Sequence, residues 1–440
     1  MPFTFLPLPS SRHPDPSLQL PWNCAQWGLL FFPLSPLLGA IGVALALLLT
    51  WWRKYRTIIR RPLNWGFALL GILMCLSIPF AYKPSDALLG IFNFLPFFIA
   101  FAAFSTLIQT TSQLRQIAWI LVLPSPIIVI LGLGQLFFGW QFHLQWVVID
   151  WAIAPGGNPP GRMASIFMYA NTLAGYLVMV FILALGLWIG HYTDLTDAQS
   201  NPSVYPRSKS VSSVVFLSLT VIGSFVALIL TNSRNAWGIA IIAGLAYALY
   251  LGWRWLVAIV MGVAASILAA AFAPKPVNLL FRTVIPAFFW ARLTDEMYPD
   301  RPVALMRSTQ WNFAWLMTLQ RPWFGWGLRN FTPMYENKMN IWLGHPHCLF
   351  LMLSMEIGIP ATLLFCGLAG WVFVQAVRVF KELNHDKTIV FTYLVLFLCF
   401  GLFNTVDVSI FDLRVNLFSW VLFSAICGLV YRYRAGVSEG

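Results

Sequence analysis

The chain has 440 residues, of which 59% are hydrophobic, 16% aromatic and only 10% charged. Soluble domains carry about 25% charged residues, so this composition excludes a soluble globular protein. Apolar runs of about 20 residues, the length that a helix needs to cross a bilayer, follow one another along the chain. Outer-membrane barrels consist of short alternating strands and do not fit this pattern. The sequence therefore predicts an all-α, polytopic helical membrane protein.

The predicted spans begin after a Pro-rich segment, residues 1–22, which we expect to be disordered. The first apolar run, near residues 27–52, contains Pro33 and Pro36. It is therefore either one long broken span or a short re-entrant hairpin followed by a full span. These two alternatives give eleven or twelve spans in total. The other runs lie near 63–81, 87–109, 116–139, 164–190, 211–230, 236–252, 255–273, 348–377, 388–405 and 413–431.

This pattern divides the chain into five parts: a tail (1–22), N-terminal transmembrane helices (23–273), a large loop (274–346), C-terminal transmembrane helices (347–432) and a second tail (433–440). Basic residues predict the orientation, because cytoplasmic loops of membrane proteins carry an excess of Lys and Arg. The short segments of one side hold Arg53, Lys54, Arg56, Arg60, Arg61, Arg115, Arg207, Lys209, Arg254, Arg378, Lys381, Lys387, Arg432 and Arg434.

The opposite side holds only Lys83, Arg162, Arg234 and Arg414 in its short segments. We therefore expect an inner-membrane protein with a cytoplasmic C-terminus and a periplasmic large loop. With twelve spans the N-terminus is cytoplasmic as well. This bias also accounts for the net charge of +12, so the charge is no evidence for a nucleic-acid partner.

The large loop carries a net charge of +4 and six Trp residues. Within it, residues 308–320 place Trp311, Ala314, Trp315 and Thr318 at helical spacing, which predicts a helix against the membrane surface. A basic, Trp-rich loop suits a ligand with an anionic head and a lipid tail or sugar faces. The alternative is an aromatic belt with ordinary solvated charges.

Three outward cations lie at the membrane ends of predicted spans. Arg234 stands in Thr231-Asn232-Ser233-Arg234 where two spans meet, Arg162 precedes the span that carries Asn171, and Lys83 lies in a tight outer turn. Ionisable groups at this depth are costly without a partner, so they are candidates for function. The alternative is that their side chains extend to lipid headgroups.

Two histidines, His345 and His347, precede the span that begins near Cys348. Histidine is the side chain best suited to accept a proton at neutral pH, which makes this pair a candidate general base. The segment could also bind a metal, but the chain offers no second cluster to complete a zinc site, so neither a metal nor a cofactor is predicted. Further along, Glu356 lies at membrane depth, where an unpaired carboxylate is expensive.

The large loop also contains Arg307, four residues before Trp311, and the segment Arg321-Pro322-Trp323-Phe324-Gly325-Trp326-Gly327. Its paired glycines allow a tight turn with exposed backbone N–H groups.

Together these motifs resemble the O-antigen ligase and polymerase superfamily (Wzy/WaaL type), especially a cyanobacterial-type group that includes proteins labelled as bicarbonate transporters. The similarity runs in order from about residue 25 to 430. Cys348 departs from it, because the family usually has Asn after this His. The motifs are Arg162 with Asn171-Thr172-Leu173-Ala174, Thr231 to Arg234, Arg307, Arg321-Pro322 with Gly325-Trp326-Gly327, and His347 with Glu356-Ile357-Gly358.

The resemblance implies a GT-C-like membrane glycosyltransferase that moves a glycan from undecaprenyl diphosphate to a hydroxyl of a glycan, lipid or protein acceptor, without metal or nucleotide sugar. The residues fit this chemistry, because guanidinium groups can stabilise the leaving diphosphate. We expect Arg234 and Arg307 in that role and His347 as the general base, with inversion at the sugar. The expected substrate-binding residues are Lys83, Arg162, Asn171, Arg321, Gly325, Gly327 and His345.

Three alternatives stay open at this stage. A bicarbonate transporter is one, although its polar groups would be expected near mid-membrane and in repeated halves. A polymerase of the same superfamily would extend the glycan instead of capping an acceptor. A purely structural membrane scaffold is the third, and the costly outer arginines disfavour it.

Overall fold

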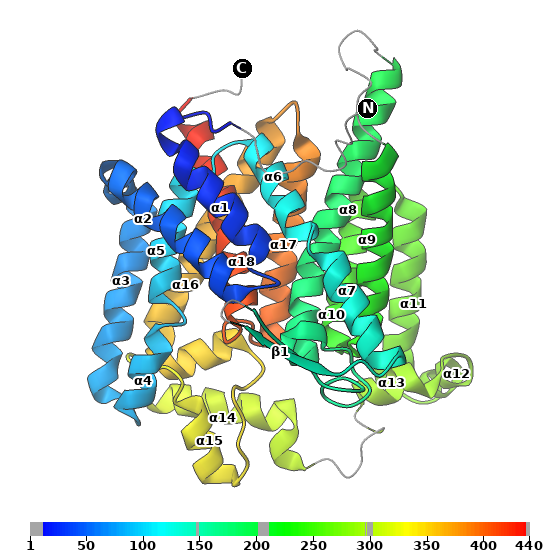
Figure 1. Cartoon of the computed structure of the whole chain (residues 1–440). Coiled ribbons are helices and arrows are strands. Elements are labelled where there is room, and N and C mark those ends of the chain that lie inside the picture. The colour runs from blue at the N-terminus through cyan, green and yellow to red at the C-terminus, as the bar shows by residue number, and fades with distance from the viewer. Residues whose placement is uncertain (1–11, 147–148, 201–210, 295, 297–301, 437–440) are drawn as a thin grey trace.

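The computed structural model describes residues 12–146, 149–200, 211–294, 296 and 302–436 (Figure 1). Several residues used in the predictions lie outside the described residues: 1–11 of the expected tail, Arg207, Lys209, Asp295, Asp300, Arg301 and residues 437–440.

The described chain is an all-α bundle with ten helices long and apolar enough to cross a membrane. α10 (Arg234–Tyr250) has 17 residues, and it runs alongside them (Figure 1). The ten are α2 (Pro36–Arg60), α3 with η2 (Pro62–Phe80), α4 with α5 (Pro84–Ile91, Leu95–Leu107), α6 with α7 (Thr111–Val122, Ser125–Phe137), α8 (Ala170–Ser200), α9 (Val211–Leu230), α11 (Arg254–Phe272), α16 (Leu349–Glu382), α17 (Lys387–Val406) and α18 (Leu413–Arg434).

The first apolar run forms a helical hairpin. α1 (Gln19–Phe31) ends before Pro33, and α2 begins at Pro36 and packs back along α1. Gly28 makes this close approach possible, because a Cβ there would lie 2.6 Å from the backbone nitrogen of Val43. Of the two alternatives for this run, the structure has the hairpin, since Pro33 falls in the turn and Pro36 is the first residue of α2, where proline is tolerated.

The start of the chain differs from the prediction, because residues 12–22 are folded. The 3₁₀ turn η1 (Pro16–Leu18) leads into α1. His13 binds the carbonyl oxygen of Leu107 through Nε2 at 2.9 Å, and Asp15 pairs with Lys54 at 2.5 Å. These contacts with two other helices hold a Pro-rich segment whose composition alone indicates disorder.

Short elements cover one end of the bundle, opposite to the C-terminus (Figure 1). A hairpin of β1 (Phe142–Trp146) and β2 (Ile149–Ile153), which the sequence analysis does not predict, contacts the α1–α2 turn through Trp151. The predicted helix over 308–320 is present as α14. The loop after α11 forms α12 (Val277–Val284), α13 (Ala287–Leu293), η4 (Val303–Leu305), α14 (Arg307–Gln320) and α15 (Phe331–Met339).

The loop is anchored to a break in α16. Gly358 has φ +83°, and around it the amides of Trp326 and Gly327 donate to the carbonyl oxygens of Met355 and Glu356 at 2.9 and 2.8 Å. The amide of Ile359 donates to the carbonyl oxygen of Pro322 at 2.7 Å. The loop therefore satisfies backbone groups that the broken helix cannot pair internally.

Two glycines make this anchor possible, and we expect their replacement to destabilise the protein. A Cβ on Gly325 would lie 2.5 Å from the carbonyl oxygen of Glu356, and one on Gly358 would lie 2.3 Å from that of Trp323. Gly325→Ala and Gly358→Ala should each cost about 1–3 kcal/mol or more of unfolding free energy, read from thermal unfolding in detergent. Gly367→Ala in the same helix, where a Cβ meets nothing within 4 Å, is the control and should lose no stability. Equal melting curves for all three variants would contradict this account.

Candidate functional site

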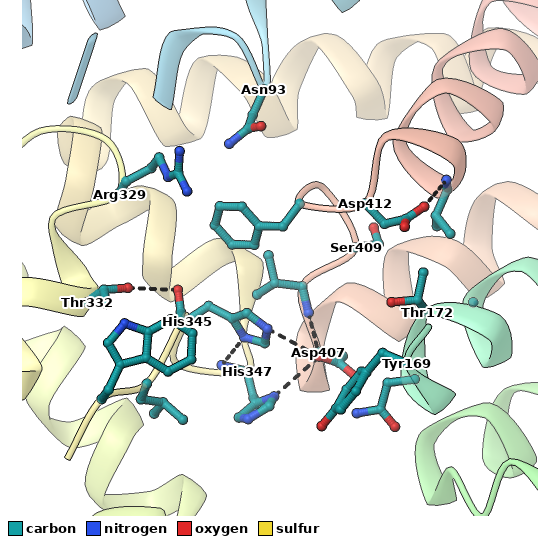
Figure 2. Close-up of a pocket in the computed structure, with 18 of the residues that line it drawn as sticks. Asn93, Tyr169, Thr172, Arg329, Thr332, His345, His347, Asp407, Ser409 and Asp412 are labelled. Atoms are coloured by element: carbon teal, nitrogen blue, oxygen red, sulfur yellow. Dashed lines mark hydrogen bonds and ion pairs between the residues drawn. The ribbon is translucent and has the colours of Figure 1, made fainter. Parts of the chain in front are cut away.

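A polar cavity of about 990 Å³ lies at the end of the bundle that the loop covers (Figure 2). Its walls come from distant parts of the chain: the start of α4, the start of α8, α15, the segment before α16 and the turn between α17 and α18. Of the predicted site residues, Lys83, Asn171, His345 and His347 line it. The cavity therefore unites outer segments that the sequence places more than two hundred positions apart.

The centre of the site is a buried carboxylate facing two imidazoles, as Figure 2 shows. Asp407, only 6% exposed, directs Oδ1 at His347 Nδ1 (3.3 Å) and at His345 Nε2 (3.9 Å), and accepts the Val408 amide at 2.9 Å. Burial raises the pKa of Asp407, but the hydrogen bond from His347 and the charges of both imidazoles outweigh it and hold the pKa below its usual value. Asp407 is therefore a carboxylate at neutral pH.

These contacts fix the tautomer of His347. A carboxylate can only accept hydrogen bonds, so His347 Nδ1 carries a proton and donates a hydrogen bond to Asp407. The neutral imidazole then holds its lone pair on Nε2. His347 itself has φ +52°, a conformation in which His is found several-fold more often than most residues. The pair has the arrangement of a general base that a carboxylate orients.

His345 is held in the neutral form. Burial, and then repulsion from the protonated form of His347, lower its pKa to about 4, with Asp407 opposing and Arg307 adding to the shift. Its Nδ1 accepts the backbone N–H of His347 at 3.2 Å, so its single proton lies on Nε2 and faces Asp407.

The same three side chains are the one group of potential metal ligands found among the described residues. One ligand atom from each of His345, His347 and Asp407 lies within 4.8 Å of the others. A metal would need an unprotonated nitrogen from each imidazole. In the hydrogen-bonded arrangement both nitrogens that face Asp407 carry protons, so a metal between these three side chains would have to displace both protons.

We expect His345 to make the fold sensitive to mild acid. Its ordinary pKa is 6.5 and its folded value about 4, so between these values the unfolded chain binds a proton that the folded chain does not. Stability should therefore fall as pH drops from 6.5 towards 4, and His345→Asn should flatten that loss. Thermal unfolding of both proteins at about pH 7 and about pH 5 measures this loss of stability. His385→Asn, at an exposed turn, is the control; an unchanged acid loss in His345→Asn would contradict the prediction.

Three predicted arginines border the centre without lining the cavity. The pKa of Arg162 is lowered, chiefly because burial disfavours its charged form. The charge of Asp407 raises this pKa and that of Arg234 lowers it. The charge of Arg307 acts on His345 in the same way. Because such effects fall off with distance, Arg162 lies within electrostatic range of Asp407 and of Arg234, and Arg307 lies within that range of His345.

Arg162 is fixed in place. Its Nε donates to the carbonyl oxygen of Thr231 at 2.8 Å, and its Nη2 donates to Asn171 Oδ1 at 2.5 Å. Arg162 thus joins the end of α9 to the start of α8, and Asn171 both lines the cavity and orients this guanidinium.

Arg234 and Arg307 each occupy the first position of a helix, α10 and α14. The N-terminal end of a helix already carries partial positive charge, so a cation there raises the local positive potential further. Both side chains are exposed. Such positions are suited to an anionic ligand, which can accept hydrogen bonds from the guanidinium and interact with the helix end.

The cavity lining also includes two cations, Lys83 and Arg329, together with the carboxylates of Asp86 and Glu336. Asn330 is fully buried. Its Oδ1 accepts the amide of Lys83 at 2.6 Å, and its Nδ2 donates to the carbonyl oxygen of Lys83 at 3.3 Å. Glu356, 1% exposed, accepts the Phe331 amide at 3.2 Å, which gives the costly carboxylate a partner and anchors the segment that carries Arg329. In the sequence Arg329 is one of several basic residues of the large loop, two positions after Gly327, and no motif distinguishes it.

Arg321, Gly325 and Gly327 lie outside the cavity lining. Arg321 donates to the carbonyl oxygen of Phe80 at 2.7 Å and stacks over Trp326, and the glycines form the anchor at α16. Their contacts are structural ones. Arg414 lies in the same turn as Asp407 and Asp412. It stacks on Phe167 and lies 3.7 Å from Asp412, whereas Asp407 contacts the histidines.

One comparison with known proteins bears on this geometry. Residues 219–366 match the family described as O-antigen ligase. The matched segment runs from α9 to the second half of α16 and includes Arg234, Arg307 and His347. No curated protein matches the chain.

Proposed function

We propose that this chain, whose residues 219–366 match the O-antigen ligase family, transfers a glycan from undecaprenyl diphosphate to an acceptor hydroxyl at the periplasmic face. The observation that carries the proposal is the His347–Asp407 pair in a polar cavity, with Arg162 and Arg307 in electrostatic range of Asp407 and His345. The arrangement supplies a base for the acceptor and positive charge for the donor.

The proposed reaction is a single displacement. His347 Nε2 takes the proton of the acceptor hydroxyl while that oxygen bonds to the anomeric carbon of the donor. The bond between this carbon and the diphosphate oxygen breaks, and the diphosphate leaves with the electron pair. Attack from the side opposite to the leaving group inverts the configuration.

Charge develops on the diphosphate as it leaves. Arg234 and Arg307 are the groups that stabilise it, since a guanidinium can bind two oxygens of one phosphate at once. Arg162 lies close to Arg234 but is committed to Thr231 and Asn171, so it supports the positive potential from a fixed position. Lys83 and Arg329 contribute charge at the far part of the cavity.

The position of the cavity suits a lipid-linked donor. It lies at the end of the apolar helices, where the head of a membrane-anchored carrier would be found. The bias of Lys and Arg towards the opposite end supports assignment of the cavity to the periplasmic side.

The direct test is transfer by the purified full chain in proteoliposomes. Lipid-linked glycans extracted from the source membranes and an acceptor fraction serve as substrates, and release of undecaprenyl diphosphate is measured beside the glycan product. We expect both to appear together, as single-step transfer for a ligase and as a ladder for a polymerase. Uptake of labelled bicarbonate without any transfer would overturn the proposal in favour of a transporter.

Asp407 is proposed as the positioning residue for His347. Asp407→Asn should lower kcat by up to about 10⁴-fold, as loss of a carboxylate that orients a general-base imidazole does, with little change in KM for the donor. Asp386→Asn, at the opposite end of α17 where the carboxylate pairs with Arg115, is the control and should leave kcat near that of the wild type. A change in KM alone would contradict the positioning role.

A further inference from the structure

At the end of the bundle opposite to the cavity, one arginine is almost completely buried. Arg61, between α2 and α3, is 8% exposed. Its Nη1 donates to Ser105 Oγ of α5 at 3.1 Å, and its guanidinium lies 4.3 Å from the centre of the Tyr431 ring of α18. Arg61 therefore lies where the ends of α2, α5 and α18 meet.

The charge of Arg61 is not balanced by any carboxylate among the described residues. Ser105 is the one hydrogen-bond partner of its side chain there, although a guanidinium carries five N–H donors. The last turn of α5, which contains Ser105, supplies at most about half a negative charge. Because a buried cation is costly unless it is paired, this position favours an anionic ligand.

Two aromatic rings connect Arg61 to a second arginine. The ring centres of Tyr431 and Trp371 lie 6.4 Å apart, and the guanidinium of Arg434 lies 5.4 Å from the centre of the Trp371 ring. A guanidinium that stacks on a ring keeps its N–H edge free for acceptors in its own plane. Both arginines can therefore donate to an anionic headgroup and keep these ring contacts.

The charge around these rings is positive. Arg432 has a buried Nε without a hydrogen-bond partner, and Arg434 is exposed and forms no ion pair with a described residue. Glu382 is the one acid in the described ends of α2, α5, α16 and α18, and it hydrogen-bonds to Tyr433. This charge favours a ligand with net negative charge over a zwitterionic one.

The depth of this group suits contact with lipid phosphates. Trp65, four positions after Arg61, is 65% exposed, and its Nε1 donates to the carbonyl oxygen of Ile59 at 2.7 Å. Exposed Trp and Tyr rings concentrate at the level of the lipid headgroups. Basic groups between transmembrane helices on the cytoplasmic side are typical positions for anionic headgroups. The excess of Lys and Arg at this end supports its assignment to that side.

We propose that Arg61 and Arg434 bind the phosphate of an anionic phospholipid in the leaflet opposite to the cavity. The headgroup supplies the negative charge, and its oxygens accept hydrogen bonds from both guanidiniums. Because Arg61 already contacts α5 and α18, the bound lipid stabilises the junction of α2 and α3 with those helices. This site is separate from the proposed reaction, and its assignment does not depend on glycan transfer.

The test compares the thermal unfolding of the full chain in nanodiscs of phosphatidylcholine alone and in nanodiscs that also contain phosphatidylglycerol. We expect phosphatidylglycerol to raise the melting temperature of the wild type by about 2–4 °C. Arg61→Gln and Arg434→Gln should each lose most of this gain, which is measured as a difference within each variant. Arg434 is exposed, so Arg434→Gln decides the outcome if Arg61→Gln does not fold.

Arg254→Gln is the matched control, because Arg254 is also exposed at this end of the bundle, at the start of α11. It should keep the full gain. No gain in the wild type, or an equal gain in all variants, would overturn the inference. A loss shared by Arg254→Gln would overturn it too, since it would indicate unspecific attraction to the bilayer surface. An equal rise with inorganic phosphate in phosphatidylcholine nanodiscs would overturn the assignment to a lipid.

Discussion

Replacing His347 with alanine is expected to lower kcat for glycan transfer about a hundredfold to ten-thousandfold, the contribution of a positioned general base. The physical reason is that Nε2 of this imidazole holds the lone pair that receives the acceptor proton, while Nδ1 donates to Asp407 at 3.3 Å. Donor binding should change little, since the diphosphate meets guanidinium groups. The measurement is the initial rate of product formation with saturating donor in proteoliposomes.

The control for this variant is His385→Ala. His385 is exposed in the turn between α16 and α17, at the end of the bundle opposite to the cavity, and its loss should leave the rate unchanged. Melting temperatures of both variants verify that the fold is intact. A His347→Ala protein with near-normal kcat would show that another group accepts the proton.

Replacing Arg234 or Arg307 with lysine is expected to lower kcat about 100- to 1,000-fold, the loss seen when one charge-stabilising donor is removed from an active site. Lysine keeps the charge but cannot bind two phosphate oxygens in one plane. The loss of kcat in these lysine variants should therefore exceed the loss of kcat that the wild type shows when added salt screens its charges. Transfer rates and donor affinity, measured separately, distinguish stabilisation of the leaving group from ground-state binding.

Arg254→Lys is a matched control, because Arg254 also opens a helix, α11, at the opposite end of the bundle. It should retain normal turnover. If Arg234→Lys and Arg307→Lys both keep wild-type kcat and donor affinity, no guanidinium clamp exists at this site.

Hydropathy alone predicted most of the fold, because each membrane helix must bury its own backbone polar groups and so appears as a continuous apolar run. α9, α11 and α17 begin and end within one residue of the predicted positions, whereas α8 begins and ends later than predicted. The order of the first segment could not be predicted, since it depends on His13 reaching Leu107 across 94 positions. The β1–β2 hairpin was missed as well, because its strands are short and lie outside the apolar runs.

The candidate site could be predicted only in part. His347 and the arginines stood out because charged and titratable groups at membrane ends are rare. Asp407 carried no comparable signal: in sequence its neighbours suggest a local pair with Arg414, and its contact with His347 spans 60 positions. Gly325 and Gly327 were assigned to substrate, whereas the structure pairs their segment with the break at Gly358. Gly358 and Pro360 within one apolar run were the available sign of that break.

In the proposed reaction, the imidazole of His347, oriented by Asp407, activates a hydroxyl for direct displacement of a lipid diphosphate. NMR of the anomeric proton and carbon, in the donor and in the product made by the purified chain, tests it most directly. We expect the configuration of the transferred sugar to be inverted. A product of retained configuration would contradict the claim, since it requires two successive displacements.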